Sequence, residues 1–157
     1  MRGLLGVGLS VGVLAGLWTQ ASIELELLTW TAFVAWACYF AAGGGRHGFT
    51  RALAANLAGA LWGWVAAQFL EQASWTGAVA VAVTVMAFVL CVQATLPLLS
   101  FIPGAFAGTA VFFGTSFDLT GTLVGLVCGA VLGWVSDLLA RRIQTAIDGP
   151  APAPTTV

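Results

Sequence analysis

The side chains that could do chemistry in this sequence are few, and those within its apolar stretches are almost all uncharged. Asn56, Ser100 and Thr109 can donate and accept hydrogen bonds, and they lie among Ala, Val, Leu, Phe and Trp. The one histidine, His47, lies in a glycine-rich loop between two arginines. We therefore interpret His47 as a solvated loop residue rather than as a metal ligand or a base. The sequence therefore predicts no catalytic site, no cofactor, no metal site and no enzyme.

Ionisable groups are nearly absent from the apolar stretches, which bears on the kind of transport that the chain could support. Ion-coupled and proton-coupled transporters place charged side chains inside their spans, because a group there must bind and release the charge. Asp137 is the exception, and Arg141 follows it four residues later. That is the favourable order for a helical ion pair, so we interpret the two as a structural salt bridge near a helix end.

Neutral polar groups set among aromatic side chains suit the passive movement of a small uncharged molecule. They suit equally well the hydrogen bonds and packing that join helices in a bundle without any transport. If a solute path exists, we expect it to involve Asn56, Trp62, Ser100, Pro103, Gly104 and Thr109.

The composition places most of the chain in a lipid bilayer. Of its 157 residues, 60% are hydrophobic and 7% are charged. In soluble domains, charged residues make up about a quarter of the sequence. A spanning helix needs about 20 apolar residues. Five or six spans therefore use up residues 1–149 as one transmembrane helical domain, and residues 150–157 form a short disordered tail. The net charge of −1 offers no basic surface for nucleic acid, and the bilayer is the expected partner.

The charges favour six crossings over five. The apolar runs cover residues 4–19, 27–42, 51–71, 75–92, 97–114 and 119–140. Six crossings place all five arginines on one side: Arg2, Arg46, Arg51, Arg141 and Arg142. They place four acidic residues on the opposite side: Glu24, Glu26, Glu71 and Asp118. By the positive-inside rule the arginine side is cytoplasmic, so both termini are expected in the cytoplasm.

Residues 97–114 are the irregular stretch, apolar but interrupted by two prolines and three glycines. Non-helical backbone at membrane depth is tolerated where protein buries it or where it lines a wet cavity. One interpretation is a broken or re-entrant segment beside a solute path. The other is a kinked helix in which Gly104 and Gly108 let a neighbouring helix pack closely.

Two glycine stripes predict closely crossed helices, either within one subunit or between subunits. The first has glycine at every fourth position: Gly8, Gly12 and Gly16. The second continues that spacing through the last span: Gly121, Gly125, Gly129 and Gly133. Stripes that face each other would close the bundle on itself, and stripes that face lipid would indicate a partner helix.

The likeness of the two glycine-striped segments leaves open an internal repeat of the first and last spans. Residues 1–22 have features of a secretory signal, but the glycine pattern favours a mature helix. Residues 43–48 are predicted to be a flexible polar connector, because glycines this dense do not hold a helix.

Several ordered motifs are similar to those of a known family. They are Leu-Thr-Trp-Thr-Ala-Phe at 28–33, Cys-Tyr-Phe-Ala at 38–41 before the glycine loop, Cys-Val-Gln-Ala at 91–94, and Leu-Leu-Ser-Phe-Ile-Pro-Gly-Ala-Phe at 98–106. Over nearly its whole length the chain resembles the YcdZ-like family of small bacterial inner-membrane proteins, domain of unknown function 1097. The resemblance implies a polytopic inner-membrane protein of similar length, and it implies no activity.

The sequence thus predicts an all-α, polytopic transmembrane helical bundle of about six hydrophobic segments in a bacterial inner membrane. The first functional hypothesis is an oligomeric channel or facilitator for a small neutral solute. The alternative is a non-transporting membrane scaffold or subunit that binds partner helices through its glycine stripes.

Overall fold

The structure, a computed structural model, describes residues 4–148 and contains six α-helices and no strand over that range. The helices are α1 (Leu5–Glu24), α2 (Thr29–Ala41), α3 (Gly45–Gln72), α4 (Ala78–Val92), α5 (Ile102–Gly114) and α6 (Leu119–Asp148). Two 3-10 turns, η2 (Gln93–Thr95) and η3 (Pro97–Leu99), connect α4 to α5. The predicted all-α bundle of six segments is confirmed. The tail predicted at 150–157, like Arg2, lies outside the described residues.

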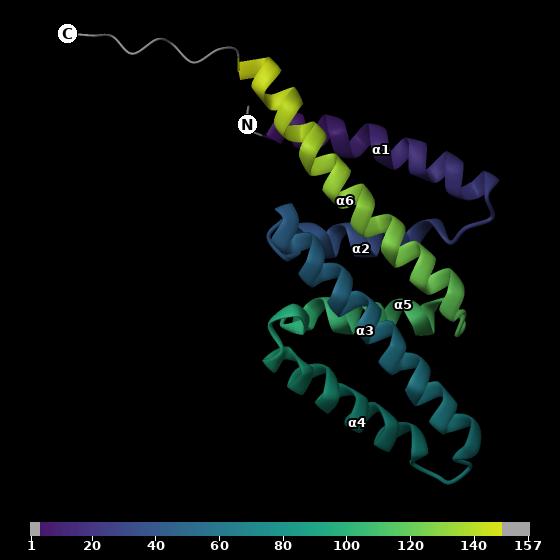
Figure 1. Ribbon diagram of the computed structural model, residues 1–157. Helices are drawn as coiled ribbons and strands as arrows, with labels where there is room; N and C mark the ends of the chain where they lie inside the picture. Colours follow the sequence, from purple (N-terminus) through teal and green to yellow (C-terminus); the bar gives the residue numbers. More distant parts are fainter. Residues whose placement is uncertain (1–3, 149–157) are drawn as a thin grey trace.

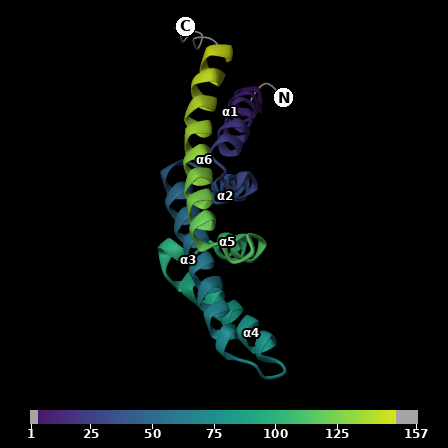
Figure 2. The same cartoon turned by 90° about the vertical axis from the view of Figure 1, so that its right-hand side faces the viewer.

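The helices form a narrow row rather than a ring. The short helices α2 and α5 run in opposite directions across the middle, and the long helices α3 and α6 cross them obliquely (Figure 1). Helix α1 flanks α6, and α4 flanks α3. Seen with α2 and α5 nearly end-on, α3 and α6 line one side of the row, and α1, α2 and α5 line the other (Figure 2).

In this fold the longest helices, α3 and α6, are those that lie obliquely (Figure 1). Three of the helices, α1, α3 and α6, have 20, 28 and 30 residues, and with Ala78–Thr95 they are long and apolar enough to cross a membrane. Helices α2 and α5 have 13 residues each, or about 20 Å at 1.5 Å per residue. An oblique helix needs more residues than a direct one to cover the same thickness. The short helices therefore run directly across the layer that the long ones cross at a slant.

The connector predicted at residues 43–48 is shorter than expected, because α3 already begins at Gly45. Gly43 and Gly44 take positive φ angles of 99° and 66°, which make the reversal. The N–H of Gly45 donates to the hydroxyl of Tyr39 at 2.7 Å, which fixes the helix start. Helix α6 also continues to Asp148, beyond the predicted end at residue 140.

The irregular stretch is broken before α5 and not within it. The non-regular backbone lies in the 3-10 turns and at residues 100 and 101, and α5 then continues without interruption. Pro97 and Pro103 lie in the first turns of η3 and α5, where the missing N–H is not needed. A methyl group at Gly108 would overlap the backbone carbonyl of Asn56. The close packing expected of this stretch is therefore present, and its irregular backbone precedes α5.

The two glycine stripes do not face each other. The α6 stripe packs on α2, where Gly129 meets the backbone of Ala32 and Gly133 meets the ring of Tyr39. Around Gly8, Gly12 and Gly16, no atom of residues 4–148 other than the backbone of α1 itself lies within 4 Å of the place that a methyl group would take. The α1 stripe thus faces away from the rest of the described chain.

Helix α1 instead contacts α6 through its other side. A methyl group at Gly6 would crowd the carbonyl of Ala140, and the hydroxyl of Ser10 donates to the carbonyl of Ser136 at 3.0 Å.

Replacing Gly59 by alanine is expected to lower the free energy of unfolding by about 1–3 kcal/mol. The added methyl group would overlap the backbone carbonyl of Ala105, so α3 and α5 would have to separate. Thermal unfolding of the detergent-solubilised protein measures the effect. Gly12→Ala is the matched control, because it adds the same group in open space. Equal unfolding temperatures for the two variants would contradict the assigned crossing.

Candidate solute site

Asn56, near the middle of α3, is the polar side chain that the fold leaves unsatisfied. It is fully buried, and neither Nδ2 nor Oδ1 has a hydrogen-bond partner within residues 4–148. The oxygen Oδ1 points at α5, 3.0 Å from the place of a Cβ at Gly104. The thiol of Cys38 in α2 lies beside the amide, but in a geometry that does not make a hydrogen bond. The amide thus lies where α2, α3 and α5 meet.

An unpaired amide in such a place is costly. Leaving a buried donor or acceptor unsatisfied costs about 1–3 kcal/mol in proteins, and at bilayer depth there is no bulk water to replace the lost bonds. The α3 backbone is already paired within the helix, so the amide is free to bind something else. This makes it a candidate for a water molecule or a small polar solute.

Apolar side chains pack on the residues next to Asn56 and Gly104, and we call this group the cover. The ring of Phe101 contacts Gly104. Leu90 of α4 is fully buried against Ala55 and Ala105, and Met86 and Phe101 pack around them. The cover therefore comes from α4 and from the segment that leads into α5.

Thr109 and Gly104 lie with Asn56 at the α3–α5 crossing. Thr109 is buried, and its hydroxyl donates to the carbonyl of Gly59 at 2.7 Å. The carbonyl of Ala105, one turn earlier in α5, is a second acceptor at 3.2 Å. Since the Thr109 hydroxyl is satisfied, it fastens α5 to α3 and is not left for a solute.

The other three predicted path residues lie elsewhere. Ser100 accepts a hydrogen bond from Nη2 of Arg51 at 2.6 Å, at the end of the bundle that carries the arginines. Pro103 is exposed. Trp62 is 37% exposed, and its Nε1 donates to Oε1 of Gln93 at 3.2 Å. The six residues predicted from the sequence therefore do not line one continuous path.

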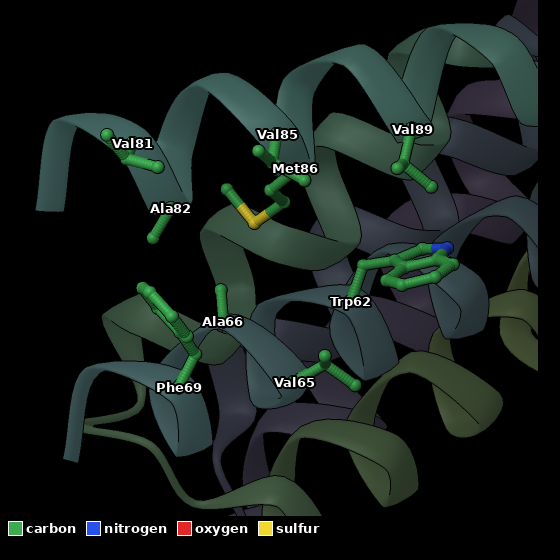
Figure 3. A pocket seen from close by; sticks show the side chains of 9 residues that line it. All are labelled: Trp62, Val65, Ala66, Phe69, Val81, Ala82, Val85, Met86 and Val89. Atoms are coloured by element: carbon green, nitrogen blue, oxygen red, sulfur yellow. The ribbon is translucent and has the colours of Figure 1, made fainter. Parts of the chain in front are cut away.

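A groove separates α3 from α4 and has a volume of about 300 Å³. Its side chains are apolar apart from the Trp62 indole N–H, and they face one another from the two helices (Figure 3). They are Trp62, Val65, Ala66 and Phe69 of α3, and Val81, Ala82, Val85, Met86 and Val89 of α4. Two further hollows lie near Trp64 and near Asp137. Neither Asn56 nor Ser100 lines any of the three.

A polar cluster that sequence reasoning found only in part fastens α2 and α3 to α6. The predicted Asp137–Arg141 pair is present, with 3.0 Å between Oδ2 and Nη2. The buried hydroxyl of Tyr39 also donates to Oδ2 of Asp137 at 2.9 Å, and the N–H of Gly45 reaches both. Tyr39 and Asp137 are 98 residues apart, and no local pattern joins them. Because the polar groups in this cluster are paired, we assign it a structural role.

Comparison with known proteins gives a consistent picture. The profile of a family described as "Protein of unknown function (DUF1097)" matches residues 8–141. The chain is 37% identical over 162 aligned residues to a protein of Escherichia coli K12 described as "Uncharacterized protein YahC", which covers 93% of this chain and 96% of that protein. It is 32% identical over 153 residues to "Inner membrane protein YcdZ" of the same organism, which covers 93% and 94%. The YcdZ protein of Salmonella typhimurium is also 32% identical, over 151 residues, with coverage of 92% and 94%. No solved structure matches.

Proposed function

The chain belongs to the DUF1097 family, and we propose that it provides a passive path for a small, uncharged, hydrogen-bonding solute. The family resemblance predicted from the sequence is confirmed, and the inner-membrane relatives with the apolar helices establish an integral, multi-pass inner-membrane protein. The observation that carries the proposal is the buried Asn56 amide, which lacks partners among the described residues.

The chemistry of this amide selects a class of solute. An amide offers one acceptor oxygen and two N–H donors, so it binds molecules such as urea, glycerol or water that both donate and accept. A solute ion would need an opposite charge at the same depth to offset its desolvation. The groups beside the amide are the Cys38 thiol and Gly104, and the ring of Phe101 packs on Gly104. The proposed solute is therefore neutral and small enough to fit beside glycine.

Asn56→Leu is expected to reduce solute flux to the rate of empty liposomes. Proteoliposomes are challenged in stopped-flow light scattering with gradients of urea, glycerol and water, and the wild type is expected to pass at least one of them faster than empty liposomes. Leucine has the same branched skeleton and needs no hydrogen bond, but it is larger. The gain of about 1–3 kcal/mol from removing the unsatisfied amide is therefore offset by tighter packing, and the variant is expected to fold with a stability close to that of the wild type.

Thr84→Val is the matched control for Asn56→Leu. Thr84 is exposed on α4, and its hydroxyl donates to a carbonyl of its own helix, so its loss should not change flux. Wild-type flux in the Asn56→Leu variant would refute the assigned site. Flat traces for every solute in folded wild-type protein would refute the passive path itself.

We also propose that the arginine-bearing end of the bundle lies in the cytoplasm. The C-terminal ends of α2, α4 and α6 lie along one long edge of the row, on the left in Figure 1, and those of α1, α3 and α5 along the other. The first edge carries Arg46 and Arg141, as the positive-inside rule requires of a cytoplasmic face, and the second carries Glu24 and Asp118. A fluorescent reporter fused to the C-terminus should fold and fluoresce, and alkaline phosphatase at the same place should be inactive. The reverse result would invert the assignment.

A second candidate function is a membrane scaffold that assembles through α1. The observation in its favour is the open stripe of Gly8, Gly12 and Gly16, which another helix could approach closely. In a background without native cysteines, Gly12→Cys should give a disulfide-linked dimer under mild oxidation. Val79→Cys, on the exposed face of α4, should not. Efficient linking together with flat solute traces would favour the scaffold, and no linking at Gly12 would count against it.

A further inference from the structure

The two halves of the chain are related by a half turn. When Figure 1 is turned upside down, α1, α2 and α3 take the places and directions of α4, α5 and α6. The contacts follow the same rule, because α5 packs on α3 as α2 packs on α6. Corresponding helices run in opposite directions across the membrane, which is the arrangement of an inverted repeat.

The closest contacts are repeated at equivalent places. A methyl group at Gly59 would overlap the carbonyl of Ala105, and one at Gly129 would overlap the carbonyl of Ala32. One turn further on, Gly63 meets the ring of Phe112, and Gly133 meets the ring of Tyr39. Each half thus supplies one short helix to a glycine pair on the long helix of the other half.

The sequence carries the same relation. The Gln-Ala-Ser at residues 20–22 and the Ala-Phe at 32–33 are matched 73 residues later by Gln-Ala-Thr at 93–95 and Ala-Phe at 105–106. In the long helices, Gly-Ala-Leu-Trp-Gly-Trp-Val at 59–65 is matched 70 residues later by Gly-Ala-Val-Leu-Gly-Trp-Val. The difference of three residues falls in the connection between the short and the long helix. The counterpart of α1 is therefore α4, and the first and last spans are neighbours but not equivalents.

The two outer helices are held unequally. Helix α1 is tied to α6 by Ser10, which donates to the Ser136 carbonyl, and by the Gly6 N–H, which donates to Gln144 Oε1 at 3.2 Å. Within residues 4–148, no side-chain hydrogen bond joins α4 itself to α3, and the apolar groove lies between them (Figure 3). Helix α1 is thus fastened to α6 through its N-terminal turns, whereas the side-chain hydrogen bonds from α3 lie beyond the end of α4, at Gln93 and Ser100.

We infer that α4, with the 3-10 turns and Phe101 that follow it, is a movable cover that opens the Asn56 site. The inference rests on the proposed function, since it concerns access to the same amide. The C-terminal part of α4 packs beside the site, where Leu90 contacts Ala55 and Ala105, the chain neighbours of Asn56 and Gly104. Its N-terminal part borders the groove, so it packs less tightly on α3 and can swing away from it. Such a movement would draw Leu90 and Phe101 away from Gly104, whereas α1 stays on α6.

Native Cys38, beside the amide, reports whether the cover opens. In Cys91→Ala/Cys128→Ala protein, its rate of modification by methyl methanethiosulfonate is measured by mass spectrometry in nanodiscs. A disulfide between Ala66→Cys and Ala82→Cys, which lie on opposite walls of the groove, then ties α4 to α3. The disulfide is expected to slow modification of Cys38 by about tenfold, which corresponds to about 1.4 kcal/mol in the opening equilibrium, and reduction should restore the rate.

The equivalent tie on the other repeat is the matched control. A disulfide between Ser10→Cys and Ser136→Cys joins α1 to α6, which are already in contact, and should leave the Cys38 rate unchanged. Equal rates with and without the α3–α4 disulfide would overturn the inference. So would a Cys38 that stays unreactive even in the Phe101→Ala variant. If the disulfide controls Cys38 reactivity but no solute flux is found, the movable cover stands and the proposed transport fails.

Discussion

The fold depends on two places where helix backbones touch. In lipid there is no hydrophobic force to drive helices together, so association relies on close packing and on hydrogen bonds between helices. Gly59 against Ala105 and Gly129 against Ala32 provide that approach, and the Thr109 hydroxyl reinforces the first of them by binding the Gly59 carbonyl. These crossings hold the short helices against the long ones. Helices α1 and α4 are then added at the two ends of this frame.

The sequence predicts the parts of this structure that depend on local composition. Apolar runs give the spans, the arginines and acids give the alternation of ends, and the spacing of Asp137 and Arg141 gives their ion pair. Local sequence does not predict what a glycine stripe faces, because that depends on which helix packs against it. Gly129 and Gly12 lie in similar patterns, yet one touches a backbone and the other touches nothing described. The start of α3 was misplaced because Tyr39 and Asp137, distant in sequence, fix it at Gly45.

For the candidate site, too, the sequence shows the residue types but not which of them come together. A lone asparagine in an apolar run is visible in the sequence, and so are the glycines that follow in α5. Their meeting is not visible, since it requires the α3–α5 crossing to place Gly104 beside the amide and α2 to bring Cys38 there. Residue type marks Trp62 and Pro103 as candidates just as it marks Gly104, but these two residues lie on outward faces. Residue type marks candidates for a solute site, and only the packing shows which of them converge.

The inverted repeat supplies a comparison within one molecule for the role of Asn56. Its counterpart 70 residues later is Leu126, which is also fully buried and packs against Ala35 and Val111. The same helix crossing is therefore built once around an amide and once around an aliphatic side chain. Because leucine serves the packing of this frame, the unpaired amide is not explained by folding. Its cost of about 1–3 kcal/mol is understandable if the amide binds a solute or water in the working protein.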